Sequence, residues 1–140
     1  MQITVGSNSK SVAKRLGKKG KELSASVKLA LFKTAADGIN IIQDRTAKGK
    51  GYNGKSFDGY SKTYKAFRRK KGRSVTPDLY FRGNMMGAMT AKSNRKQAEI
   101  FFRGAEESKK AAFNDKSRPF FEFNRSEKEE LSRAFTRYLK

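Results

Sequence analysis

The chain contains no cysteine and no histidine. Without cysteine it cannot form disulfides, thiolate nucleophiles or thiolate metal sites. Without histidine it lacks the usual metal ligand and the usual general base at neutral pH. Most hydrolytic mechanisms depend on a cysteine or a histidine, so we predict no catalytic, metal or cofactor site.

Long apolar runs are also missing from the sequence. No segment approaches the ~20 apolar residues that a membrane-spanning helix requires. The first residues, MQITVGSNSK, lack the apolar core of a secretory signal. We therefore expect a protein that is made and used on the cytosolic side, with no membrane partner.

Acidic residues are scarce, with 13 Asp and Glu against 33 Lys and Arg in 140 residues, so the net charge is +20. Such an excess is more than solubility requires and predicts a polyanionic partner or a negatively charged setting. Residues 1–104 carry +18 of this charge and residues 105–140 only +2. The length suits a single domain with an ordinary core.

Apolar residues recur at helical spacing early in the chain, at steps of four and three. They are Leu23, Val27, Leu31, Ala35, Ile39 and Ile42. This stripe predicts a main helix over residues 22–47. Residues 1–5, MQITV, alternate polar and apolar side chains before Gly6, which is compatible with a short strand or with a frayed terminus.

The basic cluster KRLGKKGK precedes the main helix and is interrupted by Gly17 and Gly20. Glycine disfavours a helix interior, so we expect residues 1–21 to be a flexible basic arm that a partner orders. Its cations are Lys14, Arg15, Lys18, Lys19 and Lys21. An anion-binding role and a solvated helix end are both compatible with them.

Residues 48–62 hold four glycines, an Asn and an Asp, a composition typical of a long loop. A short helix is expected over the next residues, ending near Phe67, and a basic loop follows it. Met86, Met89, Ala98, Ile100 and Phe102 then suit an antiparallel hairpin over residues 86–103, with KSNRK as its turn. The methionines fit a core better than a binding surface.

The C-terminal residues predict a helix over 126–139. Ser126 and Glu129 have capping-box spacing, and Leu131, Phe135, Tyr138 and Leu139 form its apolar stripe. The predicted fold class is therefore α+β. A long N-terminal helix packs on a small antiparallel sheet, accompanied by a long basic loop and a C-terminal helix.

The segment GKGYNGKS, residues 49–56, matches the phosphate-binding pattern G-x-x-x-x-G-K-S. A working phosphate loop follows a buried strand and opens a helix, so that backbone N–H groups converge on the phosphates. Here a helix precedes the segment and FDGYSK follows it. The context therefore argues against nucleotide hydrolysis.

Several landmarks occur in a defined order over residues 36–123. They are a helix ending IIQDRT, the turn-rich NGKSFDGYSKTY, a basic stretch, DLYFRGNMMGAM, the strand AEIFFR, and RPFFEF before the last helix. In this order they resemble the virion morphogenesis or tail-completion proteins of Mu-like and related tailed phages. The basic, glycine-interrupted N-terminus departs from that pattern.

The resemblance implies a small α+β structural protein of the virion neck or tail, not an enzyme, assembled in the host cytoplasm. It implies a homo-oligomeric ring that joins the head to the tail and contacts other neck, connector and tail proteins. Double-stranded DNA crossing the ring would meet the cations only if these point into the lumen. The cations are equally compatible with docking onto acidic faces of neighbouring proteins.

The segment YNGKSFDGYSKTYKAFRRKKGR, residues 52–73, mixes aromatic rings with cations. The rings are compatible with a nucleic-acid stacking surface and with packing. The family resemblance implies packing roles for Phe57, Tyr60 and Tyr64. From the residues themselves we also predict packing or interface roles for Met86, Arg118, Pro119, Phe120 and Phe121, with one of the last two rings facing a neighbour. The resemblance leaves Arg68, Arg69, Lys70, Lys71 and Arg73 on the surface.

The alternative function is a free basic nucleic-acid-binding protein of the ribosomal or chromosomal accessory type. Its high positive charge and abundant aromatic residues would be ordinary for that class. Oligomeric state separates the two hypotheses, because a free binder need not form a ring.

Overall fold

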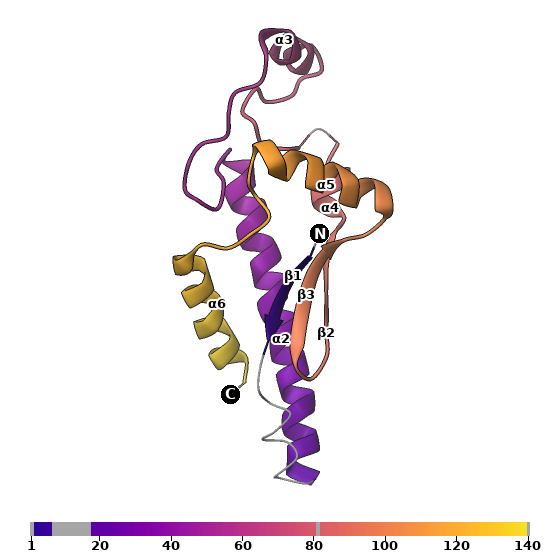
Figure 1. The fold of residues 1–140 in the computed structure, drawn as a ribbon, viewed down its shortest axis with the longest axis vertical. Coiled ribbons are helices and arrows are strands. Elements are labelled where there is room, and N and C mark those ends of the chain that lie inside the picture. The colour runs from indigo at the N-terminus through magenta and orange to yellow at the C-terminus, as the bar shows by residue number, and fades with distance from the viewer. Residues whose placement is uncertain (1, 7–17, 81, 140) are drawn as a thin grey trace.

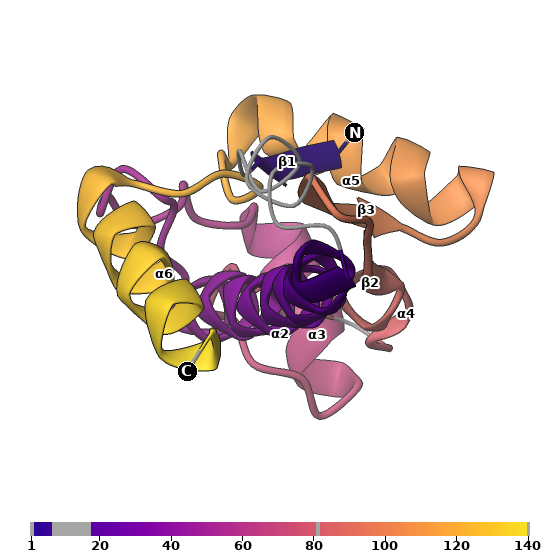
Figure 2. The same cartoon turned by 90° about the horizontal axis from the view of Figure 1, so that it is seen from below.

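The computed structural model describes residues 2–6, 18–80 and 82–139. The fold is α+β, as predicted: a long helix packs on a three-stranded antiparallel sheet and on the C-terminal helix (Figures 1 and 2). The elements follow in the order β1 (Gln2–Gly6), α2 (Lys18–Ala47), α3 (Lys62–Lys70), α4 (Asn84–Gly87), β2 (Met89–Ser93), β3 (Gln97–Phe102), α5 (Ala105–Ser117) and α6 (Arg125–Tyr138).

The main helix, α2, confirms the predicted 22–47 segment and begins four residues earlier. Val27, Leu31, Ala35 and Ile42 are buried, while Leu23 and Ile39 are partly buried against them. The helix lies between α6 and the sheet when the molecule is viewed end on (Figure 2). The helical periodicity of the sequence therefore identified the central element of the core.

The sheet has the order β1-β3-β2, with β3 in the middle. Ile100 of β3 lies opposite Ile3 of β1 and Ala91 of β2. Ala98, Ile100 and Phe102 alternate inward, as the period of a strand requires, and all three are buried. The hairpin prediction is confirmed for Met89–Phe102, joined by the turn at 94–96.

Two details of the fold expected from the sequence differ in the structure, and one helix was not expected. Met86 was expected in the hairpin, but it lies in the short helix α4, where it is buried with Met85. The expected flexible arm over residues 1–21 is also wrong in part, because residues 2–6 pair with β3 and residues 18–21 belong to α2. Residues 7–17 lie outside the described residues. Helix α5 was not predicted at all.

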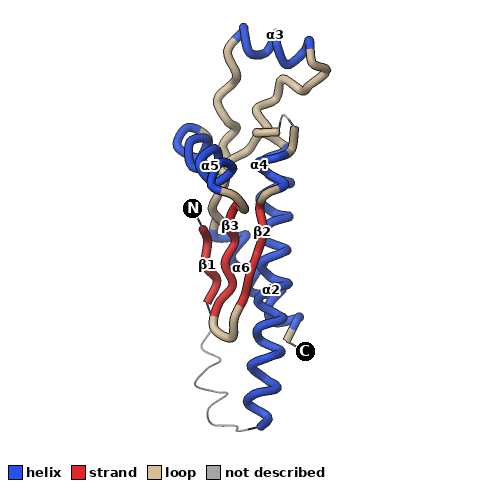
Figure 3. Tube along the Cα trace, turned by 90° about the vertical axis from the view of Figure 1, so that its right-hand side faces the viewer, coloured by secondary structure: helices blue, strands red, loops and turns tan. Residues whose placement is uncertain are grey.

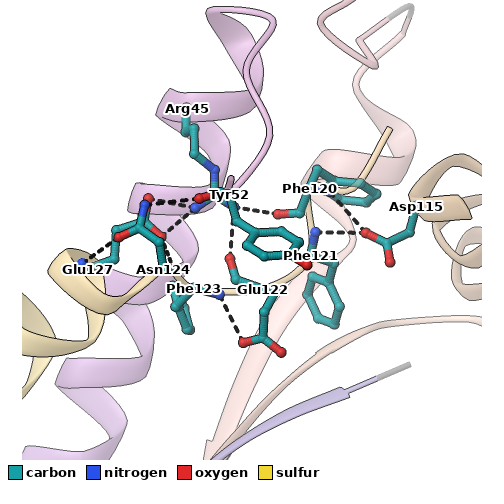
Figure 4. Close-up of polar contacts among 9 residues, drawn as sticks. All are labelled: Arg45, Tyr52, Asp115, Phe120, Phe121, Glu122, Phe123, Asn124 and Glu127. Carbon is teal, nitrogen blue, oxygen red and sulfur yellow. Dashed lines mark hydrogen bonds and ion pairs between the residues drawn. The ribbon is translucent and has the colours of Figure 1, made fainter. Parts of the chain in front are cut away.

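Helix α6 begins at Arg125, and its N-cap is Asn124 rather than the predicted Ser126. The Asn124 side chain accepts the backbone N–H of Glu127 at 2.9 Å, and the Glu127 carboxylate accepts the backbone N–H of Asn124 at 3.0 Å. This reciprocal pair is a capping box, displaced by two residues from its predicted place. Asn124 also donates to the carbonyl of Tyr52, which fixes the helix start against the loop that follows α2 (Figure 4).

Glycine at position 38 allows α2 to approach the sheet closely. A Cβ at this position would lie 2.8 Å from Cζ of Phe123 and 3.1 Å from Cδ1 of Ile100. The contact with Phe123 is shorter than packed carbon atoms tolerate, and the contact with Ile100 is tighter than most carbon contacts. The glycine thus determines how tightly α2, β3 and the segment before α6 pack together.

Both phenylalanines of the RPFFEF segment face the core. Phe120 is 0% exposed and Phe121 5%, and each ring packs on Phe102. The Asp115 carboxylate accepts both of their backbone N–H groups, at 3.0 and 2.9 Å (Figure 4). The expectation that one ring faces a neighbour is therefore wrong, because the carboxylate turns the chain so that both side chains enter the same aromatic cluster.

Candidate functional site

The chain leaves the body of the protein after residue 57 and returns to it before α4. We call residues 58–80 and Arg82 the α3 extension; its tip is α3, at the end of the molecule opposite the β2–β3 turn (Figures 1 and 3). The extension holds eight Lys and Arg against two Asp. Among the residues that the structure describes, it is therefore the strongest candidate for a polyanion-binding surface.

The helix at the tip forms for local reasons. The Ser61 side chain caps it by accepting the backbone N–H of Tyr64 at 3.2 Å. Arg68, Arg69 and Lys70 lie in its last turn, where cations complement the helix dipole. Gly72 follows with a φ of 67°, a left-handed conformation that suits a helix end. The helix prediction is confirmed and extends to Lys70.

Arg68 is buried in the extension, with only 1% of its surface exposed. Its guanidinium donates to the carbonyls of Ser74 and Tyr80, at 2.5 and 2.9 Å, and to Asp78 Oδ1 at 3.1 Å. These acceptors all come from the return segment of the extension, residues 74–80. The expectation that Arg68 lies on the surface is therefore wrong, because the return segment folds back and supplies the acceptors that a buried guanidinium needs.

Tyr60 links this buried cation to the body of the protein. Its ring lies 5.0 Å from the Arg68 guanidinium and 5.1 Å from that of Arg118, within cation–π distance of both. Arg118 also donates to the carbonyl of Asp58 from Nε and Nη2, at 3.3 Å each. Burial raises the pKa of the Tyr60 hydroxyl, and the positive charge of Arg68 opposes part of this rise.

The return segment contains Leu79, whose φ of 56° is left-handed. A non-glycine residue in this region costs about 1–2 kcal/mol, so other contacts must hold it. The Tyr80 backbone N–H donates to Asp78 Oδ1 at 3.0 Å, and the Tyr80 carbonyl accepts from Arg68. Asp78 and Tyr80, the residues on either side of Leu79, are therefore held by hydrogen bonds from the buried Arg68.

The other predicted cations of the extension are exposed. They are Arg69, Lys70, Lys71 and Arg73. Lys62 on the first turn of α3 is exposed as well. Lys62, Arg69, Lys70 and Lys71 form no ion pair with any residue that the structure describes.

The predicted aromatic packing residues divide into two kinds. Phe57 is buried in the core at 8% exposure, and Tyr60 is half-buried. Tyr64 is 37% exposed and contacts Tyr60 edge to face, with ring centroids 4.8 Å apart. The expected packing role thus describes Phe57 and Tyr60, while Tyr64 keeps much of its ring in solvent.

A cleft of about 540 Å³ lies between the extension and helices α4 and α5. Tyr64 and Arg82 contribute from the extension, and Lys110 and Arg118 from the body. Lys110 is paired with Glu106 and Glu107, at 3.1 and 3.2 Å, and these hydrogen bonds raise its pKa. Arg82 is exposed and has no ion pair among the described residues.

Arg118 lines the cleft, and the next residue, Pro119, is bonded to the loop that follows α2. The Pro119 carbonyl accepts the backbone N–H of Tyr52 at 3.2 Å. Nearby, Arg45 donates from Nη1 to Glu127, at 2.5 and 2.6 Å, and from Nη2 to the carbonyls of Phe120 and Glu122 (Figure 4). No local pattern singles out Arg45, because its acceptors lie more than 70 residues away in the chain.

The GKGYNGKS segment does not form a phosphate cradle. Gly49, Gly51 and Gly54 donate their backbone N–H groups to the carbonyls of Thr46, Lys55 and Gly51, at 2.8, 2.9 and 3.1 Å. The next helix begins only at Lys62. The N–H groups that a phosphate would need are therefore already used inside the protein.

Two groups of predicted residues stand apart from the extension. Lys14 and Arg15 lie outside the described residues, and Lys18, Lys19 and Lys21 fall in the first turn of α2. Met86 is buried in α4. The structure brings together Tyr60, Tyr64, Arg68 and Arg118, and adds Asp78 and Arg82, which no sequence pattern had identified.

Within the described residues, no helix combines the length and the apolarity that a membrane crossing requires. Comparison of the chain with protein-family models, with curated proteins and with solved structures found no match.

Proposed function

We propose that this protein is a non-enzymatic structural subunit of a tailed bacteriophage, part of the neck or tail-completion ring that joins the head to the tail. The observation that carries the proposal is a set of contacts among the segments of the phage-like pattern. These segments are IIQDRT, NGKSFDGYSKTY, DLYFRGNMMGAM and RPFFEF. Their contacts support treating the sequence pattern as one structural unit.

The contacts are hydrogen bonds between residues far apart in the chain. Arg45 of IIQDRT donates to the carbonyl of Phe120 in RPFFEF. Arg118 of RPFFEF donates to the carbonyl of Asp58 in NGKSFDGYSKTY. Gln43 of IIQDRT donates to the carbonyl of Met86 in DLYFRGNMMGAM at 3.1 Å. These bonds favour a single unit over a set of unrelated short matches.

The shape of the subunit also suits a ring. A head-to-tail ring needs two different surfaces on each subunit. On α2, Leu29 and Phe32 are 54% and 43% exposed, and they are candidates for one of these surfaces. The α3 extension projects from the body and stays available to a partner other than a second subunit (Figure 3).

The test is the mass of the purified protein by light scattering, with purified virions as the second measurement. The proposal predicts a closed oligomer, or recruitment into one by phage neck proteins, and the presence of the protein in mature particles. A protein that stays monomeric with those partners and is absent from virions would contradict it.

The second candidate is a free nucleic-acid-binding protein, favoured by the exposed cations Lys62, Arg69, Lys70 and Lys71, which have no ion pair among the described residues. It predicts a protein that binds DNA or RNA, need not form a closed ring and never enters a particle. The same two measurements distinguish it from a ring subunit.

A further inference from the structure

Several exposed cations of the α3 extension have no anionic partner among the described residues. Lys62, Arg69, Lys70 and Lys71 are exposed on and just beyond α3, and none has an ion pair with a described residue. Arg82 at the edge of the cleft likewise has none. Like charges crowded on one segment repel each other unless a partner neutralises them.

The extension presents these cations in a fixed arrangement. Arg68 ties α3 to Ser74, Asp78 and Tyr80, and Tyr60 lies between Arg68 and Arg118. The backbone that carries the exposed cations next to Arg68 is therefore held from inside before any partner arrives. Such preorganisation lowers the entropy that binding would otherwise lose.

Aromatic rings are exposed beside the cations. Tyr64, Phe67 and Tyr80 are 37%, 44% and 48% exposed. Tyr64 and Phe67 lie nearly parallel, with ring centroids 6.1 Å apart. Cations that follow a backbone, together with rings that accept bases or sugars, are the combination used by sequence-independent nucleic-acid surfaces.

A second copy of this chain is a poor match for the same surface, because most of its carboxylates are occupied. Asp37 accepts the Tyr138 hydroxyl, and Asp115 accepts two backbone N–H groups. Asp44 and Glu130 line a hollow between α2 and α6, beside the cation Arg137. Ion pairs within the subunit engage Asp78, Glu99, Glu106, Glu107, Glu127 and Glu129.

We infer that the α3 extension binds the phosphate backbone of a nucleic acid without regard to its sequence. Lys62, Arg69, Lys70, Lys71 and Arg82 make the phosphate contacts, and Tyr64 lies beside them. The inference rests on the proposed function in placing nucleic acid next to the subunit. It deepens that function by naming the partner of the extension.

The experiment measures binding of the full chain to a labelled oligonucleotide, single-stranded in one arm and duplex in the other, over a series of salt concentrations. The test variant is Arg69→Glu, Lys70→Glu and Lys71→Glu together. The matched control is Lys28→Glu, Lys96→Glu and Arg133→Glu, which makes the same change in net charge at exposed positions on α2, the β2–β3 turn and α6. Circular dichroism verifies that both variants fold.

The test variant is expected to weaken binding about tenfold or more in at least one arm. For each phosphate that the protein no longer neutralises, the log–log salt dependence should be shallower by about 0.9 in the duplex arm and by about 0.7 in the single-stranded arm. The control should keep the wild-type slope. A second variant, Arg82→Gln, should make the slope shallower by the amount expected for about one phosphate.

Equal weakening by the test variant and the control would overturn the inference, since net charge alone would explain binding. Displacement of the oligonucleotide by polyglutamate as effectively as by polyphosphate would also overturn it, in favour of an acidic protein partner. So would a wild-type chain that binds neither oligonucleotide, or a test variant that binds as wild type but fails to self-associate. Light scattering on the same samples reports ring formation separately, so weaker nucleic-acid binding and failure of the proposed ring are distinguishable.

Discussion

At the scale of single residues, Arg68 decides the shape of the α3 extension. Its guanidinium makes three hydrogen bonds to the return segment and lies 5.0 Å from the Tyr60 ring. A lysine keeps the charge but lacks the planar fork of donors that reaches all three acceptors at once. Arg68 therefore acts through both its charge and its planar set of donors, and lysine would keep only the charge.

We predict that Arg68→Lys loosens the extension without unfolding the body. Hydrogen exchange of residues 61–80 should accelerate, because each buried acceptor left unpaired costs about 1–3 kcal/mol. Exchange in α2 should change little. Arg69→Lys, on the exposed neighbour, is the control and should leave both regions as in wild type. Unchanged exchange of residues 61–80 in Arg68→Lys would contradict the role given to this side chain.

Tyr138 gives a pH-dependent prediction. Its hydroxyl donates to Asp37 at 2.6 Å, and this hydrogen bond to a carboxylate raises its pKa. Because the pKa of Tyr138 is higher in the folded state, its hydrogen bond to Asp37 contributes fully to the free energy of unfolding below about pH 10, the ordinary pKa of tyrosine. This contribution is lost as the pH rises through the pKa of Tyr138 in the folded protein.

Tyr138→Phe should therefore be less stable than wild type at neutral pH. The difference between the two proteins should shrink as pH rises above about 10. Chemical denaturation at several pH values measures it. A difference that is constant or grows with pH would show that the hydrogen bond to Asp37 has no linked effect on stability.

At the scale of elements, the start of α6 tests which residue caps the helix, Ser126 as predicted or Asn124 as observed. Ser126 has the capping-box spacing with Glu129, but Asn124 is the residue whose side chain accepts a backbone N–H of the first turn. Asn124→Ala should cost about 1 kcal/mol for the missing cap, plus the hydrogen bond to Tyr52. Ser126→Ala is the matched control and should change stability by less than about 0.5 kcal/mol. Denaturant midpoints check both, and a larger effect for Ser126→Ala would reverse the assignment.

The segment between α5 and α6 also makes a measurable prediction. Phe120→Ala and Phe121→Ala should each reduce stability by about 3–5 kcal/mol, because both rings are buried against Phe102. Phe113→Ala, on the exposed face of α5 at 75% exposure, is the control and should be nearly neutral. A small effect for either buried phenylalanine, measured by thermal or denaturant unfolding, would contradict this packing.

At the scale of the whole molecule, the protein consists of a packed body and a projecting extension. Helix α2, the sheet and α6 share one core, whereas α3 lies beyond α4 and α5 (Figure 3). Regions with few buried apolar contacts open locally at lower free energy than the core. The two parts are therefore expected to differ in stability although they belong to one chain.

Hydrogen exchange of the isolated protein should show measurable protection in residues 61–80, held by the Arg68 contacts, and stronger protection in residues 27–46. On binding a nucleic acid, protection of the extension should rise while that of residues 27–46 stays the same. Equal protection of residues 61–80 in the free and the nucleic-acid-bound protein would contradict a role for the extension in this contact.

The sequence alone determined the elements whose signals are local. The spacing from Leu23 to Ile42 indicated α2, and the alternation of Ala98, Ile100 and Phe102 indicated β3. These signals are reliable because helix and strand periods are properties of short stretches of chain. The +20 charge is a property of composition, and the polyanionic partner that it predicts stays a prediction.

Only the tertiary structure decided which of these residues face solvent. Arg68 and Arg69 are neighbours of the same type, yet the first is buried and the second exposed, because the return segment from Ser74 to Tyr80 folds back over one side of α3. Phe120 and Phe121 both turn inward because Asp115 accepts their N–H groups. Burial of a charge or a ring depends on partners that only the folded chain brings into reach, and no local period encodes them.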